Sequence, residues 1–470
     1  MTFQTFGFAI SASILWLFIT MIQPGRTTRN LLLMLFSYYF YATWNLLFLP
    51  VILGMTIYNY IMGYLVHAAR TDAARRGWTL AATVGSLGVL CYFKYNAFFY
   101  EHLDAALHSS GLLSASYSTG FLLPIGLSFY TFQSLSYVLD IYRKQSKPTS
   151  SFAEYALFVA FFPTLLSGPI SRASKLLPQI QNPRLATGDE CLEGITLIVR
   201  GLIKKMIFAD NIALLVVDPA FASSSDFSGP FLLFVTFAYS AQIYMDLSGY
   251  TDMARGIAKL FGFSLMENFN RPYAARTISE FWQRWHMSMS GFFRDYLYFS
   301  IGGSKYGNVY LNLMITFVVI GIWHGAGWNF VLYGLIHGSF VCFDRWCRTQ
   351  LGYDPASRSS GFRVLASIAI TLTIVSLSRI LFRADGLDSA ISFAQSMLTW
   401  KGGSGEVSVA GIVLVFSAYL LHYLPGNVWD RTADYFRTLP SFIAAPVLVL
   451  ITYTIIALSP GSSGFIYFDF

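Results

Sequence analysis

Long apolar stretches separated by short polar segments run along most of the chain. They cover residues 1–22, 31–66, 78–93, 121–142, 191–217, 231–250, 311–343, 364–382, 410–424 and 442–458. A helix needs about 20 mostly apolar residues to cross the hydrocarbon core of a bilayer, because it rises about 1.5 Å per residue. We therefore predict an all-α polytopic membrane protein whose apolar stretches are transmembrane helices.

Two of the longer stretches contain helix-breaking residues. Residues 31–66 are interrupted at Asn45 and Pro50, which predicts two helices joined by a tight turn. Residues 311–343 are interrupted by His-Gly-Ala-Gly at 324–327, which predicts a break in the helix there. Counted in this way, the chain holds about eleven to twelve crossings of the usual length.

Cationic residues follow alternate apolar stretches, and they predict how the chain is oriented in the membrane. They are Arg26, Arg29, Arg70, Arg75, Arg76, Arg143, Lys144 and Lys147. Loops that are rich in Lys and Arg tend to stay on the cytoplasmic side. We therefore expect these loops in the cytoplasm and both chain termini on the outer side of the membrane.

Two other segments are predicted to enter the membrane without a simple crossing. Residues 152–170 have basic segments at both ends and contain Ser-Gly-Pro at 167–169, so we expect them to be re-entrant. A full crossing is the alternative. Residues 251–306 interleave Arg and Lys with Trp, Phe and Tyr, a pattern typical of an amphipathic helix at the cytoplasmic interface.

The overall composition excludes a soluble globular protein. Of the 470 residues, 55% are hydrophobic and 12% are charged, whereas soluble domains carry about 25% charged residues. We expect one integral-membrane domain over residues 1–470. The net charge of +7 is interpreted as membrane topology and not as nucleic-acid binding. The four cysteines lack the spacing of a disulfide framework or a zinc site, so no bound metal is expected.

Histidines are the main candidates for chemistry, because the sequence contains none of the common hydrolase, P-loop, zinc-protease or dinucleotide motifs. His324 lies inside an apolar stretch, where an ionisable side chain is costly and is a functional candidate. The glycines around it would let a ligand or another helix approach the imidazole. The alternative is a core histidine that is bonded to a carbonyl group.

The other histidines are weaker candidates, with one exception. His337 is interpreted as a packing residue, and four histidines near segment ends are interpreted as solvated surface groups: His67, His102, His108 and His422.

The exception is His286, which lies in the aromatic and basic segment. On a helix, Trp282, His286 and Met289 would share one face. A neutral imidazole there could position a substrate or accept a proton, and an interfacial anchor is the alternative. Arg294 and Asp295 follow shortly, and they could bind a phosphate-bearing donor or pair with each other.

Several motifs, taken in order along most of the chain, resemble the membrane-bound O-acyltransferase (MBOAT) family. Within that family they are similar to the bacterial branch that acetylates alginate and other cell-envelope polysaccharides. The motifs cover residues 162–163, 167–172, 244–254, 268–273, 281–286 (Phe-Trp-Gln-Arg-Trp-His), 294–298, 302–303, 323–326 (Trp-His-Gly-Ala) and 465–470. One departure is conservative: Met245-Asp246-Leu247 stands where the branch often has Cys-Asp-Phe.

The resemblance implies a fold and a reaction. It implies a ring of tilted helices around a thinned centre, in the inner membrane of a bacterium, where an acyl group passes from a cytoplasmic donor to an acceptor on the outer side. The invariant histidine of the family corresponds to His324, and the second, more variable position to His286. Acetyl-CoA is the implied donor, with no bound cofactor. The implied partner is a periplasmic acetyltransferase of the SGNH type that serves a polysaccharide acceptor.

We therefore interpret the chain as a membrane O-acyltransferase with His324 and His286 as catalytic residues. The residues predicted to bind the donor or substrate are Arg284, Trp285, Arg294, Asp295, Trp323, Asp246 and Asn270, and Arg271 and Arg276 could also hold donor phosphates. The sequence leaves open which polysaccharide is acylated, and whether the group is acetyl or D-alanyl. A transporter is the rival interpretation, although the chain shows no internal repeat. A scaffold subunit without chemistry is the third.

Overall fold

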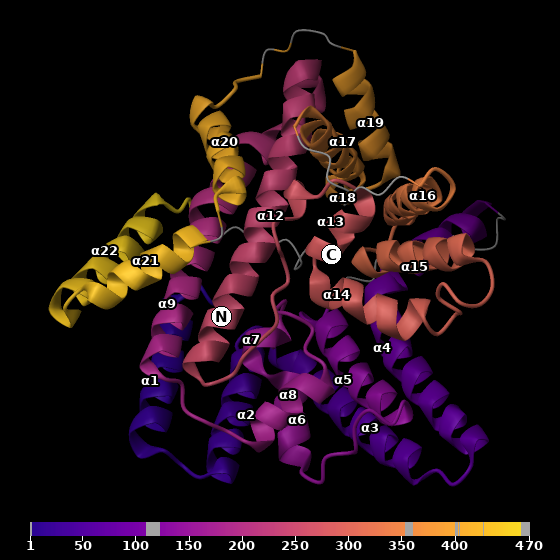
Figure 1. Ribbon diagram of the computed structural model, residues 1–470. Helices are drawn as coiled ribbons and strands as arrows, with labels where there is room; N and C mark the ends of the chain where they lie inside the picture. Colours follow the sequence, from indigo (N-terminus) through magenta and orange to yellow (C-terminus); the bar gives the residue numbers. More distant parts are fainter. Residues whose placement is uncertain are drawn as a thin grey trace. The chain divides into compact units, whose positions relative to one another are not determined.

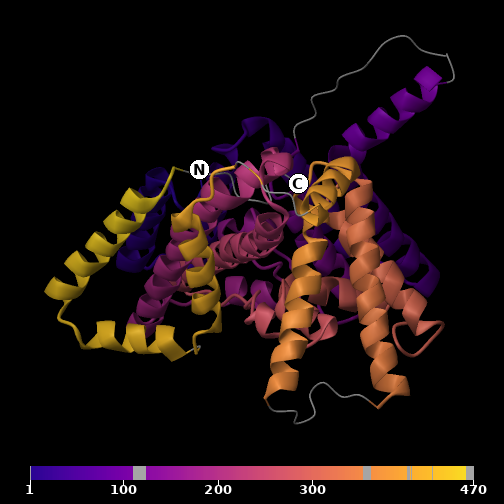
Figure 2. The same ribbon diagram turned by 90° about the horizontal axis from the view of Figure 1, so that it is seen from above.

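The computed structural model describes residues 2–109, 123–352, 361–399, 403, 405–425 and 427–461. These residues form helices joined by turns and loops, with no strand among them (Figure 1; Figure 2). The closing motif at 465–470 and the beginning of the predicted helix at 121–142 lie outside the described residues. The all-α prediction is confirmed.

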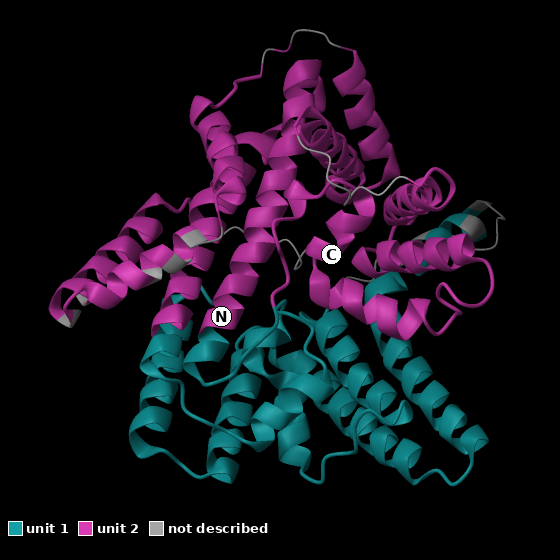
Figure 3. Ribbon diagram, viewed as in Figure 1, with its two compact units in different colours: residues 1–191, 257–266 teal, residues 192–256, 267–470 magenta. Residues whose placement is uncertain are grey.

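The chain divides into two compact units, each of which is considered by itself (Figure 3). Unit 1 comprises Met1–Cys191 and Ile257–Met266, and unit 2 comprises Leu192–Gly256 and Glu267–Phe470. The expectation of a single membrane domain over the whole chain stays a prediction.

Unit 1 contains the first eight α-helices. They are α1 (Phe6–Ile22), α2 (Arg26–Ala42), α3 (Leu49–Ala68), α4 (Asp72–Ser109), α5 (Leu127–Tyr142), α6 (Phe152–Ala160), α7 (Phe162–Leu165) and α8 (Ala173–Gln181), with a 3-10 turn, η1 (Leu46–Phe48), before α3. The predicted break in residues 31–66 is confirmed. Asn45 caps η1 by accepting a hydrogen bond from the backbone of Leu47, and Pro50 lies in the first turn of α3.

The segment that was predicted to be re-entrant forms two short helices. α6 has 9 residues and α7 has 4, and both are buried within unit 1. At about 1.5 Å per residue, neither is long enough to cross about 30 Å of hydrocarbon. A re-entrant path is compatible with these lengths, and the side of the membrane at each end stays a prediction.

Unit 2 holds the remaining helices. They are α9 (Gly188–Leu202), continued by π-helical turns η2 (Ile203–Ala209) and η3 (Ala213–Val217) around α10 (Asp210–Ile212), then α11 (Asp218–Ala222), α12 (Gly229–Leu260), α13 (Ile278–Arg284), α14 (Met287–Phe292), η6 (Phe293–Tyr298), α15 (Val309–His324), α16 (Trp328–Gln350), α17 (Phe362–Ser378), α18 (Ile380–Arg383), α19 (Leu387–Leu398), α20 (Val409–Tyr423), α21 (Asn427–Thr438) and α22 (Ser441–Leu458), with the 3-10 turns η4 (Ser224–Asp226) and η5 (Pro272–Ala274). The first residues of α9 and the last turn of α12 belong to unit 1.

Within unit 2, α9 and α12 cross at glycines. A Cβ atom added at Gly201 would lie 2.5 Å from the carbonyl oxygen of Gly249, and one added at Gly249 would lie 2.8 Å from that of Gly201. Only glycine permits backbones to approach so closely. The close crossing brings the cationic side chains of α9 and η2 against the carboxylates of α12.

α15 and α16 form the second predicted helix pair, and the break between them is confirmed. The two helices pack closely, since a Cβ atom at Gly321 would lie 2.3 Å from the carbonyl oxygen of Phe330. The aromatic ring of Phe330 also fills the space beside Gly325, where a Cβ atom would lie 2.1 Å from it. A protein side chain, and not a ligand, therefore uses the room that Gly325 provides.

Several helices are apolar enough to cross a membrane. Among the described residues, three have the length and composition of a span: Leu46–Ala68, Gly229–Leu260 and Phe362–Arg383. Shorter apolar helices cover Phe6–Ile22, Val309–His324, Val409–Tyr423 and Phe442–Leu458. The protein is a multi-pass helical membrane protein, and the predicted number of crossings stays a prediction.

Candidate active site

His286 lies in a break between two short helices. The sequence predicted one continuous helix with Trp282, His286 and Met289 on a shared face, and this prediction is wrong. α13 ends at Arg284 and α14 begins at Met287, while His286 adopts a left-handed backbone conformation with φ of 44°. Such a conformation is uncommon for a residue other than glycine.

Asn268 stabilises this break from outside the helix. Its backbone oxygen accepts a hydrogen bond from the backbone of Met287 (2.9 Å), and its Oδ1 accepts one from the backbone of Ser288 (2.9 Å). Asn270 adds a backbone hydrogen bond to the carbonyl oxygen of Arg284 (2.9 Å). These bonds replace the ones that a continuous helix would make within itself, so a distant segment sets the position of His286.

His324 is the last residue of α15 and is enclosed by aromatic rings. Ring centroids lie 4.8 Å away at Trp323, 5.1 Å away at Phe382 and 6.1 Å away at Tyr333. The side chain is buried, at 2% exposure. Its neighbours come from α15, α16 and α18, which explains why an apolar stretch of sequence alone could not reveal them.

The ring of Trp323 connects the two candidate histidines. It lies 6.0 Å from the ring of His286 and 4.8 Å from that of His324. His286 is also buried, at 2% exposure, and desolvation lowers its pKa from the usual 6.5 to about 4. The imidazole of His286 is therefore neutral at physiological pH, although it is a weaker base than an exposed histidine.

His337 is fully buried and hydrogen-bonded on both sides, and its interpretation as a packing residue stays a prediction. Trp282 Nε1 donates a hydrogen bond to His337 Nδ1 (3.2 Å), so the ring proton of the neutral imidazole is at Nε2. That nitrogen donates to the hydroxyl of Ser378 (2.9 Å), which in turn donates to the carbonyl oxygen of Val375 (2.8 Å). The chain of bonds ties α13, α16 and α17 together.

Arg379 is a buried cation that the sequence analysis did not identify. Its guanidinium carbon lies 4.3 Å from the ring centroid of Trp285, and it donates hydrogen bonds to the carbonyl oxygen of Ser240 (3.2 Å) and to the hydroxyl of Tyr273. The side chain is 1% exposed. Arg379 thereby stabilises the position of Trp285, which directly precedes His286 in the chain.

The predicted donor-binding residues lie in several different environments. Trp285 and Trp323 belong to the aromatic surroundings of the two histidines, whereas the charged residues have local ion-pair partners. Arg284 pairs with Glu280 (2.6 Å), Arg294 with Asp295 (2.8 Å), and Asp246 with Lys205 (2.8 Å), which also pairs with Asp210 (2.8 Å). Their roles in donor binding stay predictions.

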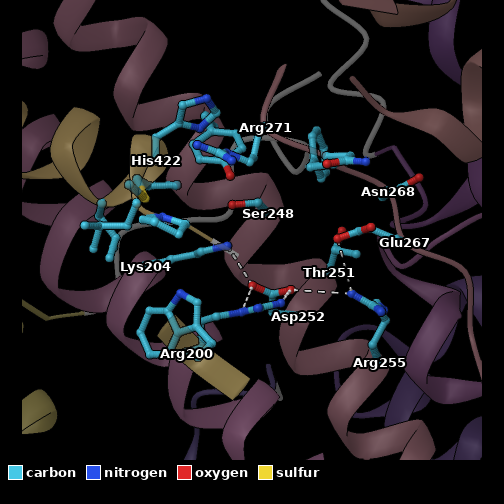
Figure 4. Close-up of a pocket in the computed structure, with 18 residues that line it drawn as sticks. Arg200, Lys204, Ser248, Thr251, Asp252, Arg255, Glu267, Asn268, Arg271 and His422 are labelled. Carbon is cyan, nitrogen blue, oxygen red and sulfur yellow. Dashed lines mark hydrogen bonds and ion pairs between the residues drawn. The ribbon is translucent and has the colours of Figure 1, made fainter. Parts of the chain in front are cut away.

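A polar pocket of about 200 Å³ lies beside Asn270 (Figure 4). It is formed by α9, η2, α12, the segment before η5, and the end of α20. Its charged and polar lining includes Arg200, Lys204, Ser248, Thr251, Asp252, Arg255, Glu267, Asn268, Asn270, Arg271 and His422. Of these, only Asn270 and Arg271 were expected to meet a donor.

The pocket shows what the sequence analysis missed. His422 was interpreted as a solvated surface histidine, which is wrong, because it is 5% exposed and its Nε2 accepts a hydrogen bond from the backbone of Tyr273 (3.2 Å). His67, His102 and His108 are exposed as expected. The sequence could have identified Arg200 and Lys204 as candidate binding residues, because they are cations one helical turn apart inside an apolar stretch.

Comparisons with known proteins identify the family to which this chain belongs. The sequence profile of the membrane-bound O-acyltransferase family matches residues 142–378. The probable alginate O-acetylase AlgI of Pseudomonas aeruginosa is 41% identical over 80% of this chain and 72% of its own length. The peptidoglycan O-acetyltransferase of Helicobacter pylori is 33% identical over 80% of this chain and 75% of its own length. The teichoic acid D-alanyltransferase of Streptococcus thermophilus is 28% identical over 55% of this chain and 68% of its own length. The chain is therefore an acyltransferase and belongs to the membrane-bound O-acyltransferase family.

Proposed function

We propose that this protein acetylates an exported polysaccharide of the bacterial cell envelope. In this proposal it lies in the inner membrane and takes the acetyl group from acetyl-CoA on the cytoplasmic side. A periplasmic partner of the SGNH type then passes the group to the polysaccharide. The observation that carries the proposal is the pair of buried histidines, His286 and His324, that meet at the ring of Trp323. Relatives that are named for O-acetylation of alginate and of peptidoglycan support the choice of acceptor.

His324 is the proposed general base. It takes the proton of the hydroxyl that first receives the acetyl group, before the partner passes that group to the polysaccharide, while the hydroxyl oxygen attacks the thioester carbonyl. A carbon–oxygen bond forms, the carbon–sulfur bond breaks, and the leaving thiolate takes up the proton from the imidazole. The aromatic surroundings of His324 exclude water, which limits hydrolysis of the donor.

His286 is proposed to position a reactant and not to act as the base. With a pKa of about 4, its imidazole is too weakly basic to take a proton efficiently near pH 7, but it stays neutral and can form hydrogen bonds. Trp285 and Trp323 are proposed to line the path of the substrate, with Arg284, Arg294, Asp295, Asp246 and Asn270 as the remaining predicted contacts.

A deletion strain tests the acceptor. We expect loss of O-acetyl groups from an envelope polysaccharide, restored by the wild-type gene but not by His324→Ala at equal abundance in the membrane. Ester-linked acetate and ester-linked D-alanine are measured in the same samples. Unchanged acetate together with lost D-alanine would replace acetyl transfer by D-alanyl transfer, the second candidate, which the 28% identical D-alanyltransferase supports. No change in either ester would contradict both.

A further inference from the structure

The pocket in unit 2 carries an excess of positive charge. Four cations, Arg200, Lys204, Arg255 and Arg271, line it together with two carboxylates, Asp252 and Glu267. Two positive charges therefore lack a carboxylate within the lining. In the low-dielectric surroundings of a membrane protein, such an excess favours an anionic ligand.

Three of these cations lie within 4.0 Å of the same carboxylate, that of Asp252. Asp252 accepts hydrogen bonds from Arg200 Nε (2.8 Å) and Lys204 Nζ (2.7 Å), and Arg255 lies 3.9 Å from it (Figure 4). Glu267 lies 3.9 Å from Arg255 and is exposed. The charge of Asp252 is thus shared and cannot neutralise the cluster.

Of the four cations that line the pocket, Arg271 is the one without a carboxylate neighbour in the part of the chain that the structure describes. Its Nη2 donates to the carbonyl oxygen of Tyr423 (2.7 Å), and among the described residues no carboxylate lies within 4.0 Å of its guanidinium. Its Nε is buried without a hydrogen-bond partner. Like His286, Arg271 adopts a left-handed backbone conformation, with φ of 47°. The backbone thus holds a charged donor in an uncommon conformation at the pocket wall.

Two buried neutral side chains in the lining also have unused donors. Because His422 Nε2 accepts a hydrogen bond, Nδ1 carries the ring proton of the neutral imidazole, and this nitrogen has no partner. Asn268 accepts through Oδ1, so its Nδ2 is a donor, and this atom also has no partner. Both residues are at least nine-tenths buried. Buried polar groups normally have partners, and the partner that suits these donors is an acceptor-rich anion.

We infer that this pocket binds a phosphate ester through Arg271, Lys204, His422 and Asn268. A phosphate group supplies several acceptor oxygens and the negative charge that the lining lacks. The volume of about 200 Å³ is below the usual range for a drug-sized ligand, so the pocket holds the phosphate end of a larger molecule.

The pocket is mechanically linked to the turn that holds His286. Asn268 lines the pocket and also accepts the two backbone hydrogen bonds that position this turn. A phosphate bound here would therefore anchor a donor next to His286, a step that rests on the proposed function. Two sources of phosphate fit the chemistry: the phosphates of a pantetheine-bearing acyl donor, and the headgroup of an anionic phospholipid, since Trp429 of the amphipathic helix α21 also lines the pocket.

Binding measurements on the full chain in nanodiscs of neutral lipid test the inference. The ligands are CoA, phosphopantetheine and pantetheine, which lacks phosphate. We expect Arg271→Gln to weaken binding of CoA and phosphopantetheine about ten- to hundredfold, the range expected for loss of a charged hydrogen bond. Arg271→Lys should recover part of that loss, and pantetheine should bind equally weakly to all variants. Arg363→Gln, which removes an exposed arginine outside the pocket, is the matched control.

A second variant, Asn268→Asp, tests the phosphate site independently, in case Arg271→Gln does not fold. Asn268→Asp keeps an oxygen to accept the hydrogen bond from Ser288 but replaces the unused donor by an acidic group, so it should also weaken phosphate binding. The lipid source is tested by native mass spectrometry of protein purified from phosphatidylglycerol-containing membranes. Phosphatidylglycerol retained by the wild type and lost in Arg271→Gln would identify the headgroup as the ligand.

Two outcomes separate this inference from the proposed function. If folded Arg271→Gln and Asn268→Asp bind CoA, phosphopantetheine and phosphatidylglycerol as the wild type does, the phosphate site is overturned, even where acetyl transfer depends on His324. If CoA binding requires the phosphate and Arg271 but the deletion strain loses no ester-linked acetate or D-alanine, the phosphate site is supported and the proposed function is contradicted.

Discussion

The ring of Trp323 lies 6.0 Å from the ring of His286, and the two ring planes are nearly perpendicular, at 87°. Because Trp323 directly precedes His324 in the chain, the same indole also contacts that imidazole, at 4.8 Å. Edge-to-face aromatic contacts favour particular ring orientations. The orientations of the two candidate catalytic histidines are therefore coupled through one side chain.

Replacing His324 should remove activity while leaving the fold intact. We expect His324→Ala to lower acyl transfer by about 10² to 10⁴ fold, the usual contribution of a general base. The change should cost about 1 to 3 kcal/mol of stability, because one buried polar group is lost. Thioester consumption and monodispersity in detergent measure the two effects.

His324→Gln is the informative companion to this variant. An amide can form hydrogen bonds but cannot take the proton, so this variant should be nearly as inactive as His324→Ala. Substantial remaining activity would show that His324 positions a reactant. The base would then have to be a residue of the partner protein, because His286 is too weakly basic.

The sequence predicted the parts of the site that depend on local chemistry. The helix break at 324–327 follows from the glycines, and the burial of His324 follows from its place in an apolar stretch, while its catalytic role stays a prediction. The break at His286 could not be predicted in the same way, because the hydrogen bonds that stabilise it come from Asn268, in another segment.

The pocket was missed for a related reason. His422 reaches Tyr273 across a long sequence separation, and Lys204 meets Asp252 only because α9 and α12 cross at Gly201 and Gly249. The sequence predicted single pocket residues such as Asn270 and Arg271. It could not predict which residues lie together, because this depends on tertiary packing.

Lowering the pH should destabilise the protein through His286. Its folded-state pKa of about 4 is below the value of 6.5 expected for an unfolded chain, so between these values the unfolded chain binds the additional proton. The stabilisation is fully present above about pH 6.5 and is lost as the pH falls through about 4, with a total on the order of 3 kcal/mol.

Thermal unfolding in detergent between pH 7 and pH 4 measures this effect. The comparison is with His286→Asn, because its side chain does not titrate and tolerates the left-handed conformation. The variant should lose less stability over this range than the wild type. Identical pH dependence would mean that His286 becomes protonated in the folded protein without cost.

Arg284 and Arg294 should contribute less to donor binding than Arg271. Each already pairs with a carboxylate, Arg284 with Glu280 at 2.6 Å and Arg294 with Asp295 at 2.8 Å. Binding a phosphate would require either arginine to share its charge or break its pair. We expect Arg284→Ala and Arg294→Ala to weaken CoA binding less than about tenfold, which corresponds to less than about 1.4 kcal/mol.

The measurement is CoA affinity of folded variants, with Arg271→Gln measured in parallel. A larger loss in Arg284→Ala than in Arg271→Gln would move the donor phosphate toward α13 and away from the pocket.

The close packing of α15 on α16 should make Gly321 intolerant of a side chain. A Cβ atom there would lie 2.3 Å from the carbonyl oxygen of Phe330, a backbone atom that cannot move without shifting α16. Gly321→Ala should therefore destabilise the protein by about 1 to 3 kcal/mol, as overpacking does. It should also lower activity, because His324 ends α15 and Tyr333 on α16 contacts its ring.

Gly54→Ala provides the control for this last prediction. Gly54 is also helical, but nothing lies within 4 Å of the added Cβ atom, so alanine should raise stability by up to about 1 kcal/mol through its higher helix propensity. Thermal unfolding and thioester consumption should thus separate the two variants, with only Gly321→Ala impaired in both. Equal behaviour of the two would mean that α15 and α16 can separate slightly at no cost, and that the distance between them does not set the position of His324.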